Sequence, residues 1–306
     1  MTLKQRIKRL EQVILSDKNA ELDFKIPLDP QEFYQDFGLL RHPKTNKPVT
    51  KLTSYQYNIW KNGQNYKYRL TIKSQKVGIT TSSLLEDFQK AITTCRGKEI
   101  LIISQSLQHA KEHLYTLRKM IVSSKKYSKF LIFKPTELLF RDEVSKVTVL
   151  YIRNPDDSFK PTRIIGLGPK EGSAWSWKEV KHIHMSDIAA SNQIDDSGLF
   201  GAVFSRLANT DGTLHIETPP RGQRGMIWEI YKASKDNHSE SSQFIVDKVH
   251  ANDAVEAGLI TDEFLKSERD RLGTKYSQYY ECDFLNSSNV WYEDDLFQYN
   301  EEELDW

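Results

Sequence analysis

The chain has 306 residues, of which 38% are hydrophobic and 28% charged, and its formal net charge is +1. This is an ordinary composition for a folded globular chain, long enough for one large domain or two modest ones around a substantial core. No apolar run is long enough to cross a bilayer, and the N-terminus lacks the apolar centre of a signal peptide, so neither a membrane span nor secretion is expected. Cys95 and Cys282 stand alone without metal-ligand spacing, which predicts two reduced structural thiols.

The charge is distributed unevenly along the chain. Residues 41–130 hold 18 Lys and Arg against 4 Asp and Glu, whereas residues 251–306 hold 4 against 15. The basic part is interspersed with tyrosines and ends in Lys125, Lys126 and Lys129, a mixture that suits contact with a nucleic-acid backbone. Solvated helix and loop positions in a lysine-rich chain explain the same counts equally well.

The first part of the chain is expected to form an arm ahead of the main domain. Residues 3–16 have the pattern of a basic helix, and proline-bounded residues 25–30 predict an extended segment. A capped helix is predicted over residues 51–62, with Thr53 or Ser54 as its N-cap.

A strand, a tight turn and a helix are expected over residues 68–87. The first residues favour a strand, Gly78 is the only glycine, and hydroxyl residues that include Thr80 and Thr81 begin an amphipathic run. Helix N-termini attract anions, glycine lets the backbone close around a phosphate, and a threonine hydroxyl can bind Mg²⁺. The lysine of an ordinary P-loop is missing because Ile79 occupies its place. By itself the pattern is a weak signal for a phosphate site, since such turns are common in α/β proteins.

Alternating strands and helices follow. Residues 98–104 predict a buried strand and residues 107–122 a helix, which together with the preceding unit indicates a doubly wound sheet. Glycines and tryptophans between Gly166 and Trp177 are typical of a loop. Three apolar runs divided by turn residues predict a β-hairpin excursion, and they cover residues 129–133, 147–152 and 162–167.

Two later strands end in polar residues. Residues 180–186 predict a strand followed by Asp187, and a carboxylate at the carboxyl end of a parallel strand lies where α/β sheets bind ligands. The alternative is that Asp187 caps the next helix. Residues 213–218 predict a strand with Glu217 and Thr218 at its end. The remaining patterns predict helices over 199–207, 226–233, 261–271 and 275–282, a strand over 244–249 and an acidic tail over 292–306.

In this order the motifs resemble the ATPase domain of large terminase subunits, the motors that package DNA into tailed-virus capsids, and the resemblance covers roughly residues 50–295. Terminases often carry a deviant Walker A motif whose lysine lies upstream of the glycine, and residues 73–80 follow that pattern. The resemblance implies that Lys73 meets the β- and γ-phosphates, that Lys76 fills a basic position often occupied by arginine, and that Thr80 binds Mg²⁺. The other nucleotide-binding residues that it implies in this loop are Ser74, Gln75, Val77, Gly78, Ile79 and Thr81.

The Walker B and coupling motifs match the family with departures. Residues 183–189 are similar to a Walker B variant in which Asp187 takes the place of the catalytic glutamate. Ser186 stands where the metal-orienting aspartate is usual, and the resemblance implies that Mg²⁺ lies near both residues, partly through water. Glu217 and Thr218 resemble the coupling motif, whose hydroxyl senses the γ-phosphate. Because aspartate is one methylene shorter than glutamate, slow hydrolysis is expected.

The resemblance also implies the fold and the domain organisation. It predicts an α/β P-loop NTPase of the additional-strand, catalytic-glutamate type, with a mainly parallel sheet flanked by helices. Tyr55 and Gln56 match the adenine-reading Q motif, since an amide offers both a donor and an acceptor, although a helical glutamine usually faces solvent. The expected divisions are an N-terminal helical arm (1–50), the P-loop ATPase core (51–250), and a C-terminal helical subdomain with an acidic tail (251–306). The tail lacks strand context for a two-metal carboxylate cluster, so no nuclease domain is expected.

The activity that the resemblance implies is hydrolysis of ATP with Mg²⁺, coupled to translocation of double-stranded DNA into a procapsid. Its expected partners are the portal and the small terminase subunit, its expected assembly is a homo-oligomeric ring without a membrane, and its expected location is the cytoplasm of the infected host cell. Such sites commonly use an arginine from a neighbouring subunit, and Arg141, Arg153 and Arg163 are candidates, although a plain surface charge is the favoured interpretation of each.

Two other functions stay open. A DNA-binding or assembly module with a degenerate P-loop and no efficient hydrolysis is favoured by Ile79 and Ser186. A helicase-like ATPase is the second, although the sequence has no DEAD-type box and no arginine-bearing helicase motif near its end.

Overall fold

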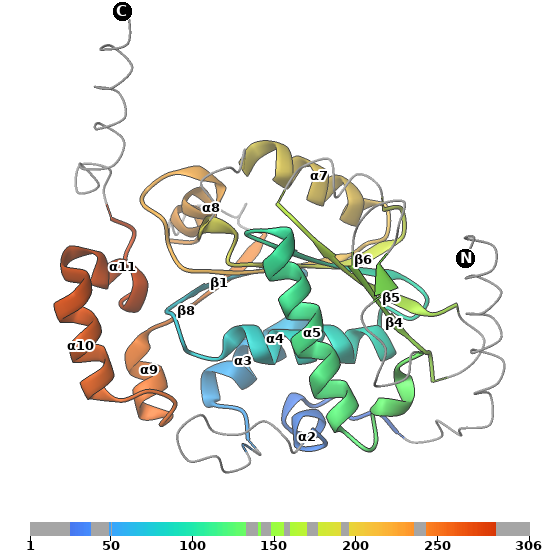
Figure 1. The fold of residues 1–306 in the computed structure, drawn as a ribbon. Coiled ribbons are helices and arrows are strands. Elements are labelled where there is room, and N and C mark those ends of the chain that lie inside the picture. The colour runs from blue at the N-terminus through green and yellow to red at the C-terminus, as the bar shows by residue number, and fades with distance from the viewer. Residues whose placement is uncertain are drawn as a thin grey trace, which may run out of the picture.

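The structure is a computed structural model, and it describes residues 25–37, 49, 51–132, 140–141, 148–155, 160–169, 177–190, 196–235 and 243–285. Within these residues an eight-stranded sheet is covered by helices on both faces (Figure 1). The strands are β1 (Tyr68–Lys73), β2 (Glu99–Ser104), β3 (Phe140–Arg141), β4 (Thr148–Ile152), β5 (Thr162–Leu167), β6 (Val180–Ser186), β7 (Thr213–Thr218) and β8 (Phe244–Val249).

The strand order is β3-β4-β5-β2-β6-β7-β1-β8. In this sheet order, the six strands that begin with β5 and end with β8 are parallel. Strands β4 and β3 extend the sheet with antiparallel pairing. Strand β7 lies between the strand of the glycine turn, β1, and the strand that precedes Asp187, β6. This is the additional-strand arrangement, and it confirms the expected fold class, including the β4–β5 hairpin.

Helices α2 to α5 cover one face of the sheet and α7 and α8 the other, while α9 to α11 lie together beside the β8 edge (Figure 1). The described helices are α2 (Pro30–Gln35), α3 (Ser54–Asn65), α4 (Ile79–Ile92), α5 (Leu107–Ser123), α7 (Asp196–Ala208), α8 (Gly225–Lys235), α9 (Ala251–Glu256), α10 (Asp262–Leu272) and α11 (Tyr276–Tyr280), with 3-10 turns η1 (Ser128–Phe130), η2 (Ile188–Ala190) and η3 (Gly273–Lys275). None of these helices has the length and apolarity to cross a membrane.

Apolar clusters on the two faces of the sheet hold these layers together. The face covered by α7 and α8 holds buried apolar side chains such as Ile183, Leu214 and Phe200, each at most 2% exposed. On the α2–α5 face, the outer strands are apolar, but the central strands β6, β7 and β1 present charged and polar side chains towards α4. Burial of charge is expensive unless partners compensate it, so this central region needs a specific explanation.

Helix α3 begins as the sequence predicts. Thr53 is its N-cap: its side chain accepts from the Gln56 N–H, and the Gln56 side chain accepts from the Thr53 N–H. This reciprocal capping box satisfies two otherwise unpaired donors of the first turn. Helix α2 was not predicted; it is capped by Asp29 and buries Phe33 and the following Phe37 against the domain.

Two sequence predictions in the middle of the chain are wrong. Of the strand expected over residues 129–133, the described residues 129–132 do not form one: Ser128–Phe130 is a 3-10 turn that buries Phe130 among aromatic rings, followed by one bridge from Leu131 to Ile152. Gly166 lies inside β5 rather than in a loop. A Cβ there would lie 3.2 Å from the Ala110 carbonyl oxygen, so glycine permits α5 to pack closely on the strand. The expected helix over residues 3–16 and the acidic tail lie outside the described residues.

Candidate functional site

One lysine joins the carboxyl ends of the three central strands. Lys73 Nζ, at the end of β1, lies 3.0 Å from Asp187 Oδ1 and 3.0 Å from Glu217 Oε2. It also donates to Thr80 Oγ1 at 2.9 Å, in the first turn of α4. The structure therefore brings together four residues that lie up to 144 positions apart, at the edge of the sheet where parallel α/β folds bind ligands.

The turn between β1 and α4 has the backbone of an anion-binding loop. Gly78 is the N-cap of α4 with a φ of 75°, and no side chain caps the helix, so its first N–H groups face the loop. Lys76 also has a positive φ, of 64°. The backbone angle favours glycine at position 78, and a Cβ there would lie 2.8 Å from Gln56 Nε2, so any other residue would also displace the Gln56 amide.

The predicted Q motif contacts this loop directly. Tyr55 donates its hydroxyl to the Val77 carbonyl oxygen at 2.9 Å, and Gln56 Nε2 donates to the Gly78 carbonyl oxygen at 3.1 Å. The other amide atom of Gln56 is used in the capping box of α3. The two residues thus fix the position of the loop, and their contact with an adenine stays a prediction.

The C-terminal helices pack on the other side of the loop. The N–H of Ser74 donates to the Val249 carbonyl oxygen at 2.8 Å and that of Gln75 to the Tyr279 carbonyl oxygen at 3.1 Å. Val77 and Ile79 are buried in a cluster with residues of α9 to α11. Ile79, which stands in the usual lysine position, is therefore a packing residue here. Of the other predicted loop residues, Lys76 is exposed and Thr81 half-buried.

Asp187 is held in an unusual backbone conformation. Its φ is 53°, and its N–H donates to the Glu217 carbonyl oxygen at 2.8 Å. Non-glycine residues in the left-handed region cost about 1–3 kcal/mol and cluster at functional sites. The next element is the 3-10 turn η2, so the described structure offers no α-helix for Asp187 to cap. Its side chain is 32% exposed, which leaves the carboxylate open to solvent beside Lys73.

The hydroxyls of Ser186 and Thr218 form hydrogen bonds with groups other than Lys73. Ser186 is buried and donates to Glu217 Oε1 at 2.7 Å. Thr218 Oγ1 accepts from the Ala189 N–H at 3.2 Å and donates to the Pro219 carbonyl oxygen. Thr218 therefore ties the end of β7 to the turn after Asp187. Its role as a γ-phosphate sensor stays a prediction.

The two carboxylates beside Lys73 differ in basicity. Burial raises the pKa of Glu217, but Lys73 and His184 more than offset this and hold it at about 2. Burial also raises the pKa of Asp187; Lys73 opposes the increase, and the charge of Glu217 adds to it, so the pKa stays above its ordinary value. Burial alone would lower the pKa of Lys73, but the two carboxylates raise it. Glu217 is therefore a fixed anion, and Asp187 is the better proton acceptor.

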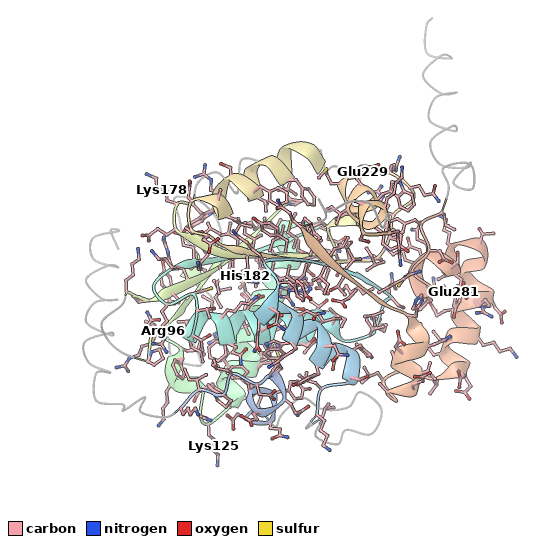
Figure 2. The ribbon with its side chains drawn as sticks, turned by 180° about the vertical axis from the view of Figure 1, so that it is seen from behind. Arg96, Lys125, Lys178, His182, Glu229 and Glu281 are labelled. Atoms are coloured by element: carbon pink, nitrogen blue, oxygen red, sulfur yellow. The ribbon has the colours of Figure 1, made fainter. Side chains whose placement is uncertain are left out.

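A buried network of charges continues from Glu217 under the sheet. His184 Nε2 lies 3.4 Å from Glu217 Oε1, and its Nδ1 lies 2.7 Å from Asp87 Oδ2 on α4. Burial lowers the pKa of His184, but the Asp87 carboxylate raises it to about 10, so the ring is a cation. Asp87 also lies 3.2 Å from His182 Nε2. Figure 2 shows His182 deep within the molecule, between the sheet and the helices.

The buried part of this network is not among the predicted site residues, although the sequence carries a signal for it. Polar residues alternate along the three central strands with the period of two that puts them on one face. On these strands the predicted site residues lie only at the carboxyl ends: Lys73, Ser186, Glu217 and Thr218. The alternating members are Arg69, Thr71 and Lys73 in β1, His182, His184 and Ser186 in β6, and His215 and Glu217 in β7.

No protein-family model and no curated protein sequence matches this chain. Solved structures do. The large terminase ATPase domain of Thermus phage P74-26 aligns with a TM-score of 0.61 at 14% identity, over 85% of this chain and 100% of that one. The large terminase of bacteriophage HK97 aligns with a TM-score of 0.61 at 11% identity, over 84% of this chain and 54% of that one. The fold is that of a large-terminase ATPase domain.

A nucleotide complex is among the structures with this terminase fold. The large terminase of another thermophilic bacteriophage, in complex with ATP-gamma-S, aligns with a TM-score of 0.56 at 10% identity, over 76% of this chain and 53% of that one. The present chain thus spans about half of the longer terminases and the whole of the P74-26 ATPase domain.

The oxygen donors around Lys73 fit Mg²⁺. Within the described residues, no group of three or more His, Cys, Asp or Glu side chains is arranged to hold a metal alone. Mg²⁺ at nucleotide sites uses one or two carboxylates, a hydroxyl and substrate phosphates rather than a protein cage. Thr80, Glu217, Ser186 and Asp187 supply oxygen ligands of that kind beside the loop.

The candidate arginines differ in what the structure shows of them. Arg163 forms an ion pair with Glu99 and packs its guanidinium 5.4 Å from the Trp177 ring, so it is engaged within its own chain. Arg153 follows β4, and the side chain of Arg141 lies outside the described residues. The action of the three arginines on a neighbouring subunit stays a prediction.

Proposed function

We propose that this chain is the ATP-hydrolysing motor domain of a viral DNA-packaging terminase, which translocates double-stranded DNA into a procapsid. The observation that supports it is the convergence of Lys73, Thr80, Asp187 and Glu217 at one strand edge beside a glycine-initiated helix. The terminase fold and the ATP-gamma-S complex of a large terminase with that fold support nucleotide binding at this position.

The residues have separable tasks under this proposal. The N–H groups that begin α4 and the Lys73 ammonium bind the phosphates and neutralise charge that develops on the transferred group. Asp187, the more basic carboxylate, orients the attacking water and accepts its proton. Thr218, tied to the Ala189 N–H, couples the phosphate end of the site to the turn after β6. Thr80 and a neighbouring carboxylate would hold Mg²⁺ when it binds with ATP. The ion would neutralise charge on the phosphate oxygens.

Asp187→Asn tests the assignment of the water-orienting group. The amide keeps the shape but cannot accept the proton, so ATP turnover is expected to fall about 10²-fold or more, while the Kd for ADP changes by less than about threefold. Steady-state phosphate release and fluorescence titration with a labelled nucleotide measure the two quantities. Asp270→Asn, on the exposed side of α10, is the matched control. Equal turnover by the wild type and Asp187→Asn would remove Asp187 from the reaction.

The second candidate is a DNA-binding or assembly module that binds nucleotide without efficient hydrolysis. Ser186 in place of the usual aspartate and the packing role of Ile79 favour it. The deciding measurement is ATP turnover by the assembled wild-type protein with Mg²⁺ and duplex DNA. Turnover supports the motor, and binding without turnover supports the module.

DNA contact is proposed for the exposed basic turn after α5. Lys125 and Lys129 are exposed, and Figure 2 shows Lys125 extending away from the body of the molecule. Lys126, expected to act with them, is instead ion-paired with Asp36 at 2.5 Å. The double variant Lys125→Ala/Lys129→Ala is therefore expected to weaken duplex binding and to reduce the slope of log K against log salt by about 2.

Fluorescence anisotropy with a labelled duplex at several salt concentrations gives that slope. The matched control removes two exposed lysines elsewhere, Lys178→Ala/Lys266→Ala, and is expected to leave the slope within experimental error. An unchanged slope in the Lys125/Lys129 variant would place the DNA surface on another part of the chain.

The wider assignment follows from the motor proposal. The portal and the small terminase subunit are the proposed protein partners, a homo-oligomeric ring is the proposed active assembly, and the cytoplasm of the infected host cell is the proposed location. Analytical ultracentrifugation of the chain with ADP and duplex DNA tests the assembly, and a monomer under all conditions would count against the ring.

A further inference from the structure

A carboxylate stands beside the position where the Walker B motif lacks one. Ser186, at the end of β6, cannot supply the negative charge that orients a metal ion. Its Cα partner on the neighbouring strand is Glu217 of β7, and the Ser186 hydroxyl donates to Glu217 Oε1 at 2.7 Å. The carboxylate that is missing at the end of β6 is thus present at the paired position of β7.

The topology brings this second carboxylate towards the loop. Strand β7 lies between β6 and β1, so a side chain at the end of β7 is one strand closer to Lys73 and to the start of α4. Glu217 Oε2 accepts from Thr80 Oγ1 at 3.1 Å and lies 3.0 Å from Lys73 Nζ. Thr80 carries the hydroxyl of the loop that is proposed to bind the metal. Its hydrogen bond to an acidic side chain goes to Glu217 and not to Asp187.

Glu217 is built into the site rather than placed at its surface. Its side chain is fully buried, with the His184 ring stacked on His215 behind it. His184 Nε2 lies 3.4 Å from Glu217 Oε1 and, within the described part of the chain, has no hydrogen-bond partner. The Asp87 carboxylate fixes the other ring nitrogen at 2.7 Å. The ring is therefore held with its Nε2 atom aimed at the Glu217 carboxylate.

We propose that Glu217 is the metal-orienting carboxylate of this site, acting with Thr80 in place of Ser186. The inference rests on the proposed nucleotide-binding function and assigns the divalent cation of the nucleotide to a residue of the coupling motif. The two carboxylates then have different roles. Glu217 binds the cation, and Asp187, on the more exposed side of Lys73, orients the attacking water. Oxygen donors of this type suit a hard cation such as Mg²⁺ or its paramagnetic substitute Mn²⁺.

The test measures Mn²⁺ binding by electron paramagnetic resonance in the presence of ATP-gamma-S. Glu217→Gln removes the anionic oxygen and is expected to weaken nucleotide-dependent Mn²⁺ binding at least about tenfold. Glu112→Gln, the same change on the exposed side of α5, is the matched control and is expected to change it by less than about threefold. The exchange variant Ser186→Asp/Glu217→Ser returns an acid to the usual strand and is expected to recover most of the binding. Equal Mn²⁺ affinity in the wild type and Glu217→Gln would overturn the proposal.

A measurement on the wild type covers the case in which Glu217→Gln does not fold. With ¹³C at the glutamate carboxyl carbons only, the Mn²⁺–ATP-gamma-S complex is expected to show a ¹³C hyperfine coupling, and its absence would overturn the proposal. Binding of ATP-gamma-S in EDTA separates this result from the function itself. A wild type that binds no nucleotide contradicts the proposed function, whereas one that binds Mn²⁺–nucleotide without a glutamate coupling contradicts only the role of Glu217.

Discussion

Lys73→Ala is expected to abolish measurable ATP turnover. Among the described residues, Lys73 is the one lysine or arginine that the structure joins to Asp187 and Glu217, and it also reaches Thr80. Removal of a preorganised group that stabilises developing charge costs about 10²–10³ in rate. In Lys73→Ala the loss of rate is expected to exceed the effect of removing one hydrogen bond. Ile79, in the usual lysine position, is buried in the apolar cluster, so no second lysine can replace Lys73.

The measurement is phosphate release with Mg²⁺ and duplex DNA, together with ADP binding. Lys266→Ala, an exposed lysine of α10, is the matched control and is expected to keep wild-type turnover. Unfolding must be followed in parallel, because the variant leaves two carboxylates side by side; one of them is expected to take up a proton. Turnover that is insensitive to Lys73→Ala would contradict the phosphate assignment and favour a different nucleotide site.

The parts of the site that the sequence predicts are those that end regular elements. Strand-forming runs predict β1, β6 and β7, and each run ends in or just before a polar residue, so Lys73, Asp187 and Glu217 are visible at strand ends. Parallel strands bring such ends to one edge. Their proximity therefore follows from the fold, whereas the direct contact between Lys73 and both carboxylates requires the strand order, which the sequence alone does not give.

The parts that the sequence does not predict depend on contacts between distant elements. Asp87 looks like an ordinary polar residue of an amphipathic helix, yet α4 is buried so completely that this carboxylate meets His182 and His184. Phe130 looks like part of a strand, yet packing against Phe88 and Tyr127 favours a 3-10 turn. In both cases tertiary packing overrides the local pattern.

Glu86→Gln is expected to cost the largest amount of stability of any single change considered for this chain. Glu86 Oε1 lies 2.6 Å from Arg69 Nη2 and 2.8 Å from Lys90 Nζ, and all three side chains are buried. One carboxylate thus compensates two buried cations. Removing one partner of a buried ion pair costs about 3–5 kcal/mol, because it leaves charge without compensation. Gly63 contributes to this arrangement, since a Cβ there would lie 2.2 Å from Glu86 Oε1.

Urea unfolding measures this cost as a lower midpoint at an unchanged m-value. Glu112→Gln, on the exposed side of α5, is the matched control and is expected to stay within about 0.5 kcal/mol of the wild type.

The difference in unfolding free energy between the wild type and Glu86→Gln should also depend on pH. Burial raises the pKa of Glu86, but Arg69 and Lys90 more than offset this and hold it below 4.5. A lowered carboxylate pKa stabilises the fold above the unfolded pKa, so the difference between variant and wild type is expected to shrink as pH falls below about 4.5.

A triple variant separates the charge from the packing. Arg69→Met/Glu86→Leu/Lys90→Met removes all three charges together, and replacing a buried ion network by apolar residues of similar volume is often neutral. It is expected to be more stable than Glu86→Gln, although Arg69 also donates to the Ile59 carbonyl oxygen of α3 at 2.6 Å and that bond is lost. A loss below about 1 kcal/mol for Glu86→Gln would mean that water or another group compensates the two cations. The buried charges of Arg69, Glu86 and Lys90 would then contribute little to the position of α3, the helix whose Tyr55 and Gln56 hold the loop between β1 and α4.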